Sequence, residues 1–232
     1  MHPVLTDRPS RHRQSGVSLI FALITLIALM MGALALVRNT DTASLLLGNL
    51  GFKQDATLSA DQATRIAISW LNANSAGLNA DMATDGYYAS NKEYSTDGTT
   101  RVGPIDITGA QSSSDTSRQL IDWDNNNCSA AAASSYATCS IKPKAITETI
   151  NHNSASYVIL RMCNKAGDYT TDSTIVCLKP LTSSSDGATG RGELNYSEYA
   201  RFGSTAQTYF RVLVRMQGQR GATSYTETIV HF

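Results

Sequence analysis

A long stretch without any charged side chain, residues 17–37, constrains this chain more than any other feature of its sequence. At about 1.5 Å per residue, a helix over this stretch spans roughly 31 Å, close to the hydrocarbon thickness of a bilayer. Its only polar side chains belong to Ser18 and Thr25, whose hydroxyl groups can donate to helix carbonyls. The alternatives are a cleaved secretory signal, whose apolar region is usually about 7–15 residues, and a buried core helix. The stretch is longer and no small-residue cleavage pattern follows it, so it predicts a retained transmembrane helix.

The charges around this stretch predict its orientation and exclude one class of function. The leader, residues 1–16, contains Arg8, Arg11 and Arg13 against the single acid Asp7. Short basic flanks stay in the cytoplasm, so everything that follows the apolar stretch is expected to be exported. Over the whole chain 19 basic and 19 acidic residues cancel, and no excess of positive charge is left to bind nucleic acid.

All four cysteines lie in the part of the chain that is expected to be exported: Cys128, Cys139, Cys163 and Cys177. An even number of cysteines in an oxidising compartment favours disulfide bonds. Four cysteines allow three connectivities, and we favour Cys128–Cys139 and Cys163–Cys177 because each pair closes a short loop. Each bond is expected to contribute about 3 kcal/mol in the loop-entropy model. A zinc site is the alternative, but it calls for close pairs such as Cys-x-x-Cys, which the sequence lacks.

A second helical pattern, residues 38–76, follows the apolar stretch. Its charged residues fall mostly away from an apolar stripe, and we interpret the stripe as packing against the protein's own sheet. Gly48 and Gly51 are poor helix residues, and a capping-box pattern begins at Ser59, so a bend or a break is permitted. The stripe consists of Phe52, Ala56, Ala63, Ile66, Ala67, Trp70 and Leu71.

Residues 77–232 predict a loop-rich head with an antiparallel sheet. Up to residue 156 only short apolar pieces occur, whereas the last third alternates as strands do. Four strands are expected there, at residues 157–163, 174–178, 209–216 and 226–232. The third of them places one set of apolar side chains on a single face, opposite Arg211 and Arg215: Phe210, Val212, Val214 and Met216.

These segments add up to an α+β fold, in which one long N-terminal helix precedes the sheet head. The expected organisation is a basic leader (1–16), a transmembrane helix (17–37), an amphipathic continuation of the helix (38–76) and a loop-rich head (77–232).

Motifs for catalysis and cofactors are missing from the sequence. Outside the leader the only histidines are His152 and His231, and neither lies in a nucleophile, phosphate-binding or zinc-protease motif. The sequence therefore predicts no enzyme, no catalytic residue and no cofactor.

Residues 122–127 resemble the first half of a calcium-binding loop, with acidic or amide side chains at alternate positions. An EF-hand loop also needs glycine at position six and glutamate at position twelve, where this chain has Asn127 and Ala133. A turn rich in Asp and Asn is therefore the preferred interpretation, and a divalent cation site is the alternative.

The junction between leader and apolar stretch carries a motif. Residues 13–20 read Arg-Gln-Ser-Gly-Val-Ser-Leu-Ile, Arg38 follows the apolar stretch, and Gly48-Asn49 lies in the next helical segment. A basic leader that ends in glycine before an apolar helix resembles a type IV prepilin, and these further residues resemble the PilX-type minor pilins. The resemblance is specific over residues 11–71, weaker over 209–232 and absent between them.

The resemblance implies a pilin-like fold and a processing site. Prepilin peptidase would cut after Gly16 and methylate the new amine of Val17. Major pilins carry glutamate at mature position five, where this chain has Phe21. The absence of this glutamate puts ordinary placement inside a filament in doubt. PilX-like and some secretion pseudopilin sequences share the absence.

The function that the resemblance implies is that of a minor pilin, acting in initiation and assembly of a type IV pilus near its tip. The implied partners are other minor pilins, the major pilin, prepilin peptidase, the inner-membrane assembly platform and a PilY-type tip adhesin. The implied location is the bacterial inner membrane, with the N-terminus cytoplasmic and the C-terminus periplasmic, and then the pilus. The alternatives are a tip pseudopilin of type II secretion, a signal-anchored periplasmic binding domain and an anchored hydrolase.

Overall fold

The computed structural model describes residues 17–111, 114–179 and 208–231. The chain divides into two compact units, Met1–Leu50 and Gly51–Phe232, and each is described by itself.

The helix α1, Val17–Ala73, begins in the first unit and ends in the second. It continues through Gly48, Gly51 and Ser59 without the break that the sequence permits. Its N-terminal part is long and apolar enough to span a membrane, and none of that apolar window is buried against protein. The Thr25 hydroxyl lies 3.0 Å from the Phe21 carbonyl oxygen, so this polar group is satisfied within the helix.

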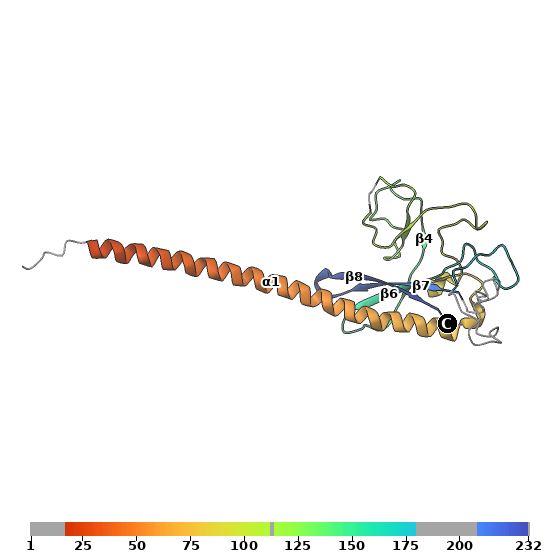
Figure 1. Cartoon of the computed structure of the whole chain (residues 1–232), viewed down its shortest axis with the longest axis horizontal. Coiled ribbons are helices and arrows are strands. Elements are labelled where there is room, and N and C mark those ends of the chain that lie inside the picture. Colours follow the sequence, from red (N-terminus) through yellow and green to blue (C-terminus); the bar gives the residue numbers. More distant parts are fainter. Residues whose placement is uncertain (1–16, 112–113, 180–207, 232) are drawn as a thin grey trace, which may run out of the picture. The chain divides into compact units, whose positions relative to one another are not determined.

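The second unit contains two sheets (Figure 1). The larger has the order β1 (Tyr87–Tyr88), β6 (Ser154–Arg161), β7 (Phe210–Gln217), β8 (Thr223–Val230), and β5 (Lys144–Ala145) also pairs with β6. The smaller has the order β2 (Ile105–Asp106), β3 (Gln119–Ile121), β4 (Thr138–Ile141).

The strand directions correct the expectation of an antiparallel head. In the larger sheet β5, β6, β7 and β8 pair antiparallel, but β1 runs parallel to β6. All pairs of the smaller sheet are parallel. Parallel neighbours need a long crossover connection, and the loop-rich residues between β1 and β6 supply one. The fold is therefore α+β with mixed sheets.

Three of the four expected strands are present, as β6, β7 and β8. The fourth expectation, a strand over residues 174–178, is wrong: this segment makes only an isolated bridge between Cys163 and Cys177. Its apolar side chains Val176 and Leu178 are 68% and 58% exposed, so no buried face holds the segment in a sheet.

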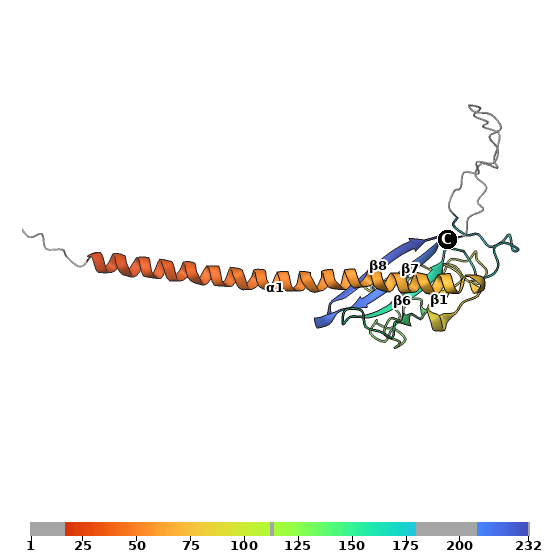
Figure 2. The ribbon, with the colours of Figure 1, turned by 90° about the horizontal axis from the view of Figure 1, so that it is seen from below.

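The C-terminal part of α1 packs on one face of the larger sheet, as the apolar stripe predicts (Figures 1 and 2). Two details of that prediction need correction, because Ala60 is fully buried in this core and Ile66 is 38% exposed. The buried face consists mainly of alanines, whose small side chains let a helix backbone approach a sheet closely. The fully buried positions are Ala56, Ala60, Ala63, Ala67 and Leu71.

A second core lies on the opposite face of β6 and β7 and joins the larger sheet to the smaller one. Val158, Leu160 and Leu213 contribute from the larger sheet, and Ile121 and Ile141 from the smaller. Because β6 and β7 are covered on both faces, their apolar residues include continuous runs as well as an alternating pattern.

Candidate functional site

The residues of the expected processing site lie at the start of the chain. Gly16 falls outside the described residues, and Val17 is the first residue of α1. Phe21 lies in the first turns of α1 with 64% of its surface exposed, and no described residue packs it into a protein core. A large apolar side chain that is exposed on the uncharged N-terminal part of a helix is suited to contact with lipid or with another apolar helix.

The four cysteines form the two disulfides favoured from the sequence. Cys128 pairs with Cys139, and Cys163 pairs with Cys177, so none of the four is free. The first bond joins the loop after β3 to strand β4, and the second closes the loop after β6. A disulfide sulfur has no thiolate to offer, so the four cysteines cannot form the zinc site considered as an alternative.

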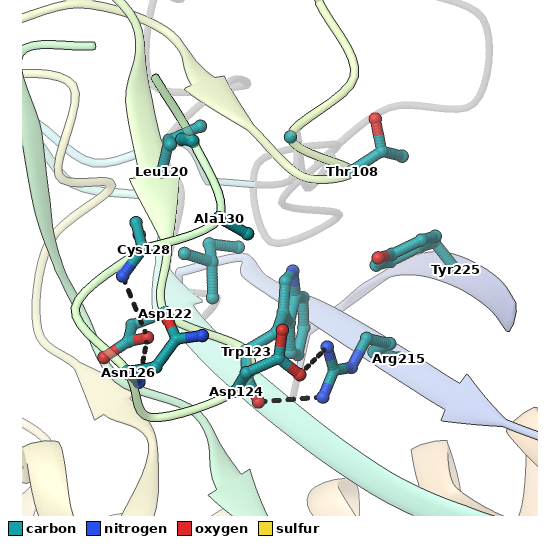
Figure 3. A pocket seen from close by; sticks show the side chains of 13 residues that line it. Thr108, Leu120, Asp122, Trp123, Asp124, Asn126, Cys128, Ala130, Arg215 and Tyr225 are labelled. Carbon is teal, nitrogen blue, oxygen red and sulfur yellow. Dashed lines mark hydrogen bonds and ion pairs between the residues drawn. The ribbon is translucent and has the colours of Figure 1, made fainter. Parts of the chain in front are cut away.

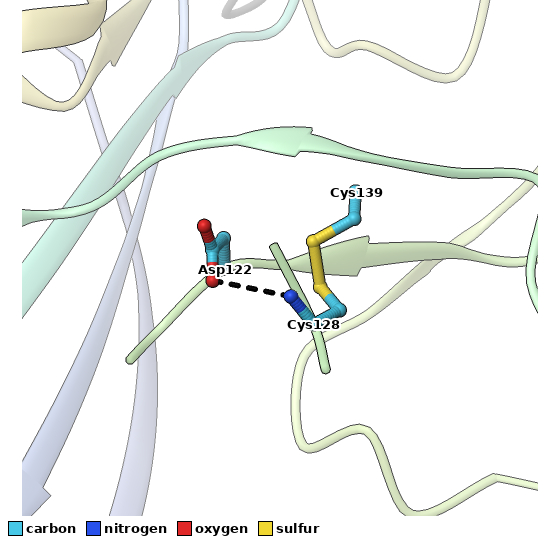
Figure 4. A group of neighbouring side chains, drawn as sticks. All are labelled: Asp122, Cys128 and Cys139. Atoms are coloured by element: carbon cyan, nitrogen blue, oxygen red, sulfur yellow. Dashed lines mark hydrogen bonds between the residues drawn. A yellow bond between two sulfur atoms is a disulfide. The ribbon is translucent and has the colours of Figure 1, made fainter. Parts of the chain in front are cut away.

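Asp122 is the centre of the loop that resembles a calcium site (Figure 4). Its carboxylate accepts hydrogen bonds from the backbone N–H groups of Asn126 at 2.9 Å, Asn127 at 3.1 Å and Cys128 at 3.4 Å. The Lys142 ammonium binds the same carboxylate and also lies 3.0 Å from the Asn127 side-chain oxygen. Protein donors therefore take the place of a metal ion, which supports the turn interpretation over the divalent cation site.

The donors around the Asp122 carboxylate determine its pKa. Burial raises its pKa, but the hydrogen bonds from Lys142 and from the three backbone N–H groups outweigh burial and hold the pKa below its ordinary value. A carboxyl group whose pKa is depressed by folding stabilises the protein above its unfolded-state pKa, and this contribution is lost as the pH falls through the folded-state pKa.

An Asp122→Asn variant is expected to lose about 2 kcal/mol of unfolding free energy at pH 7, because an amide has no charge for Lys142 and accepts fewer hydrogen bonds. The deficit relative to the unmodified protein is expected to shrink as the pH falls below about 4. Chemical denaturation of the full chain at several pH values measures both effects. Asp61→Asn, on the exposed surface of α1, is the control and is expected to stay within about 0.5 kcal/mol. A deficit that is independent of pH would contradict the account.

A cavity of about 190 Å³ adjoins this loop (Figure 3). Arg215 of β7 lines this cavity. Its Nη1 donates to the Asp124 carboxylate at 2.7 Å, and its Nη2 donates to the Trp123 carbonyl oxygen at 2.8 Å. The Arg215 guanidinium also lies over the Trp123 indole, 5.6 Å from its ring centroid. Tyr225, opposite Arg215 on β8, places its ring 5.9 Å from that of Trp123.

Sequence reasoning missed this cavity, although it placed Arg215 on the face of the strand opposite Phe210, Val212, Val214 and Met216. An arginine at an inward position of a strand that is covered on both faces indicates a polar partner in the segments that pack on that face. The partners, Trp123 and Asp124, belong to the loop after β3, and no local pattern relates that loop to β7.

Arg161 at the end of β6 is another buried cation that sequence reasoning missed. It is 1% exposed, and its guanidinium donates to the carbonyl oxygens of Ala89, Leu78 and Gly167 at distances of 2.7–3.0 Å. A further bond of 3.1 Å reaches the Asn79 side-chain oxygen. These acceptors come from three separate loops, so Arg161 joins them to the sheet.

Comparison of the chain with protein-family models, with curated proteins and with solved structures finds no match.

Proposed function

We propose that this protein is a minor pilin of the PilX type, which helps to initiate and assemble a type IV pilus and lies near the filament tip. Its role is structural rather than catalytic. The proposal includes cleavage after Gly16, anchoring in the inner membrane with the head on the periplasmic side, and assembly with other minor pilins and the major pilin.

The observation that carries the proposal is the continuity of α1. One helix runs from Val17 to Ala73. Its apolar N-terminal part is long enough to cross a bilayer, and the alanine face of its C-terminal part packs into one core of the head. A signal-anchored binding domain needs only a tether between anchor and domain. A pilin uses the same helix for membrane insertion and for the fold of its head, and the prepilin-like leader precedes such a helix here.

Phe21 supports a position near the tip. In the family's assembly scheme, the glutamate at mature position five of an incoming subunit is attracted to the terminal amine of the subunit already in place. An unpaired carboxylate inside a bilayer costs roughly 2.5–3.5 kcal/mol on insertion scales, so this pairing favours docking. A first subunit has no subunit ahead of it and needs no such glutamate. Its own Val17 amine still receives the glutamate of the next subunit.

The position and copy number of the protein in sheared pili test this proposal. We expect few copies per filament, with immunogold label at one end. Phe21→Glu is expected to let the protein enter the shaft of the filament. Phe21→Gln introduces a side chain with the shape of glutamate but without its charge, and it is expected to leave the protein at the filament end. Label spread evenly along filaments of the unmodified protein would contradict the tip position.

A further inference from the structure

The walls of the cavity beside Trp123 come from the loop after β2, from β3 and the loop after it, and from strands β7 and β8 (Figure 3). At about 190 Å³ it is smaller than the roughly 300–1,000 Å³ of pockets that enclose drug-sized ligands, so it suits a ligand of a single small ring. Its rim includes the exposed residues Thr108, Asp124 and Asn126, so solvent reaches it from the loop side.

The charges of the cavity cancel. Arg215 is paired with Asp124, and the buried carboxylate of Asp122 is paired with Lys142. An anionic ligand would have to displace Asp124 from Arg215, and a cationic ligand would have to displace Arg215 from Asp124. The site therefore favours a neutral ligand.

Several polar groups around the cavity have hydrogen-bonding capacity left. Arg215 is 7% exposed, and each terminal nitrogen of its guanidinium carries two N–H groups but donates only one hydrogen bond to the described residues. Asp124 uses one carboxylate oxygen for Arg215, and its side chain is 55% exposed. Within the described part of the chain, the Tyr225 hydroxyl makes no hydrogen bond. Donors and acceptors thus stand side by side, which suits hydroxyl groups because each of these both donates and accepts.

The aromatic rings of the cavity are held in fixed positions. The Trp123 indole N–H donates to the Ile107 carbonyl oxygen at 2.7 Å, and the Arg215 guanidinium packs on the indole ring. Tyr225 is half-buried, and its ring stands next to the indole. A rigid aromatic surface in a solvent-accessible pocket binds the apolar C–H face of a ligand, and the polar edge of that ligand then contacts the surrounding polar groups.

We infer that this cavity is a binding site for one neutral sugar ring. Its C–H face packs against Tyr225 and the edge of Trp123, and neighbouring hydroxyls bridge the Arg215 guanidinium and the Asp124 carboxylate. This inference does not depend on the proposed role in a pilus, because all of its residues belong to the head. A single ring in an open cavity of this size is expected to bind with a Kd on the order of 1 mM.

Saturation-transfer NMR on the full chain in lipid nanodiscs tests the inference, since nanodiscs avoid sugar-based detergents. The probes are the methyl glycosides of glucose, galactose and mannose together with N-acetylglucosamine, with glucuronic acid and glucosamine as charged counterparts. We expect saturable transfer to at least one neutral probe through its ring C–H protons, and weaker transfer to its charged counterparts.

Two variants locate the site. Asp124→Asn is expected to lower the affinity at least about tenfold, since it removes the charged acceptor beside Arg215. Glu227→Gln is the matched control, because Glu227 of β8 pairs with Arg211 of β7 but does not line the cavity. The affinity of this variant for the neutral probe is expected to be unchanged. No saturable transfer to any neutral probe, tighter binding of a charged probe, or equal binding by Asp124→Asn would each overturn the inference.

Discussion

A Gly16→Glu variant is expected to accumulate as the uncut precursor, with no mature form in the membrane. In the prepilin resemblance the peptidase accepts a small residue immediately before the cut, and a charged side chain at that position does not fit. The uncut chain keeps its basic leader, so no free amine is available at Val17 and the protein is expected to be absent from sheared pili. Immunoblotting and intact-mass measurement of membrane and pilus fractions report both outcomes.

Ser10→Glu is the control for this variant, because it adds the same charge to the leader at a distance from the cut. It is expected to be processed normally. Mature protein in the Gly16→Glu strain at the level of the unmodified strain would contradict cleavage at this position.

An Arg161→Met variant is expected to lose about 3–5 kcal/mol of unfolding free energy. Methionine fills part of the space but donates no hydrogen bond. The carbonyl oxygens of Ala89 and Gly167 therefore lose the Arg161 donor, and that of Leu78 keeps only the Tyr87 hydroxyl. Burial lowers the pKa of Arg161, because removal from water disfavours the charged form of the guanidinium. Chemical denaturation of the full chain, followed by a head-domain signal, measures the loss.

Two further variants separate this effect from a general loss of positive charge. Arg211→Met removes the arginine that pairs with Glu227 near the surface, and it is expected to cost no more than about 1 kcal/mol. Arg161→Lys is expected to recover little, because one ammonium group cannot reach acceptors that surround a planar guanidinium. A similar loss of unfolding free energy for Arg161→Met and Arg211→Met would contradict the stabilising role of the Arg161 hydrogen bonds.

The features that were predictable from the sequence are those that depend on neighbouring residues. Helix α1 follows from an apolar stretch and a helical period, and β7 follows from strict alternation of its side chains. The two disulfide pairings follow from short loops between neighbouring cysteines. Each of these features is set by residues that are close to one another in the sequence, so no long-range information is needed.

The features that were missed depend on contacts between distant segments. The parallel pairing of β1 with β6 joins residues that lie far apart in the chain, and the two residues of β1 are too few to carry a pattern. The same holds for Arg161, whose acceptors come from separate loops, and for Arg215, whose partners lie in the loop after β3. The exposed Ile66 was assigned to the core because apolar character alone does not decide which side of a helix meets the sheet.

The mass of the mature N-terminus tests the central claim most directly. Protein purified from the membrane of its own host is digested, and the N-terminal peptide is identified by mass spectrometry. The account predicts a chain that begins at Val17 and carries one methyl group on its amine. A chain that still begins at Met1, or one that begins beyond Val37 after removal of the apolar stretch, would contradict it.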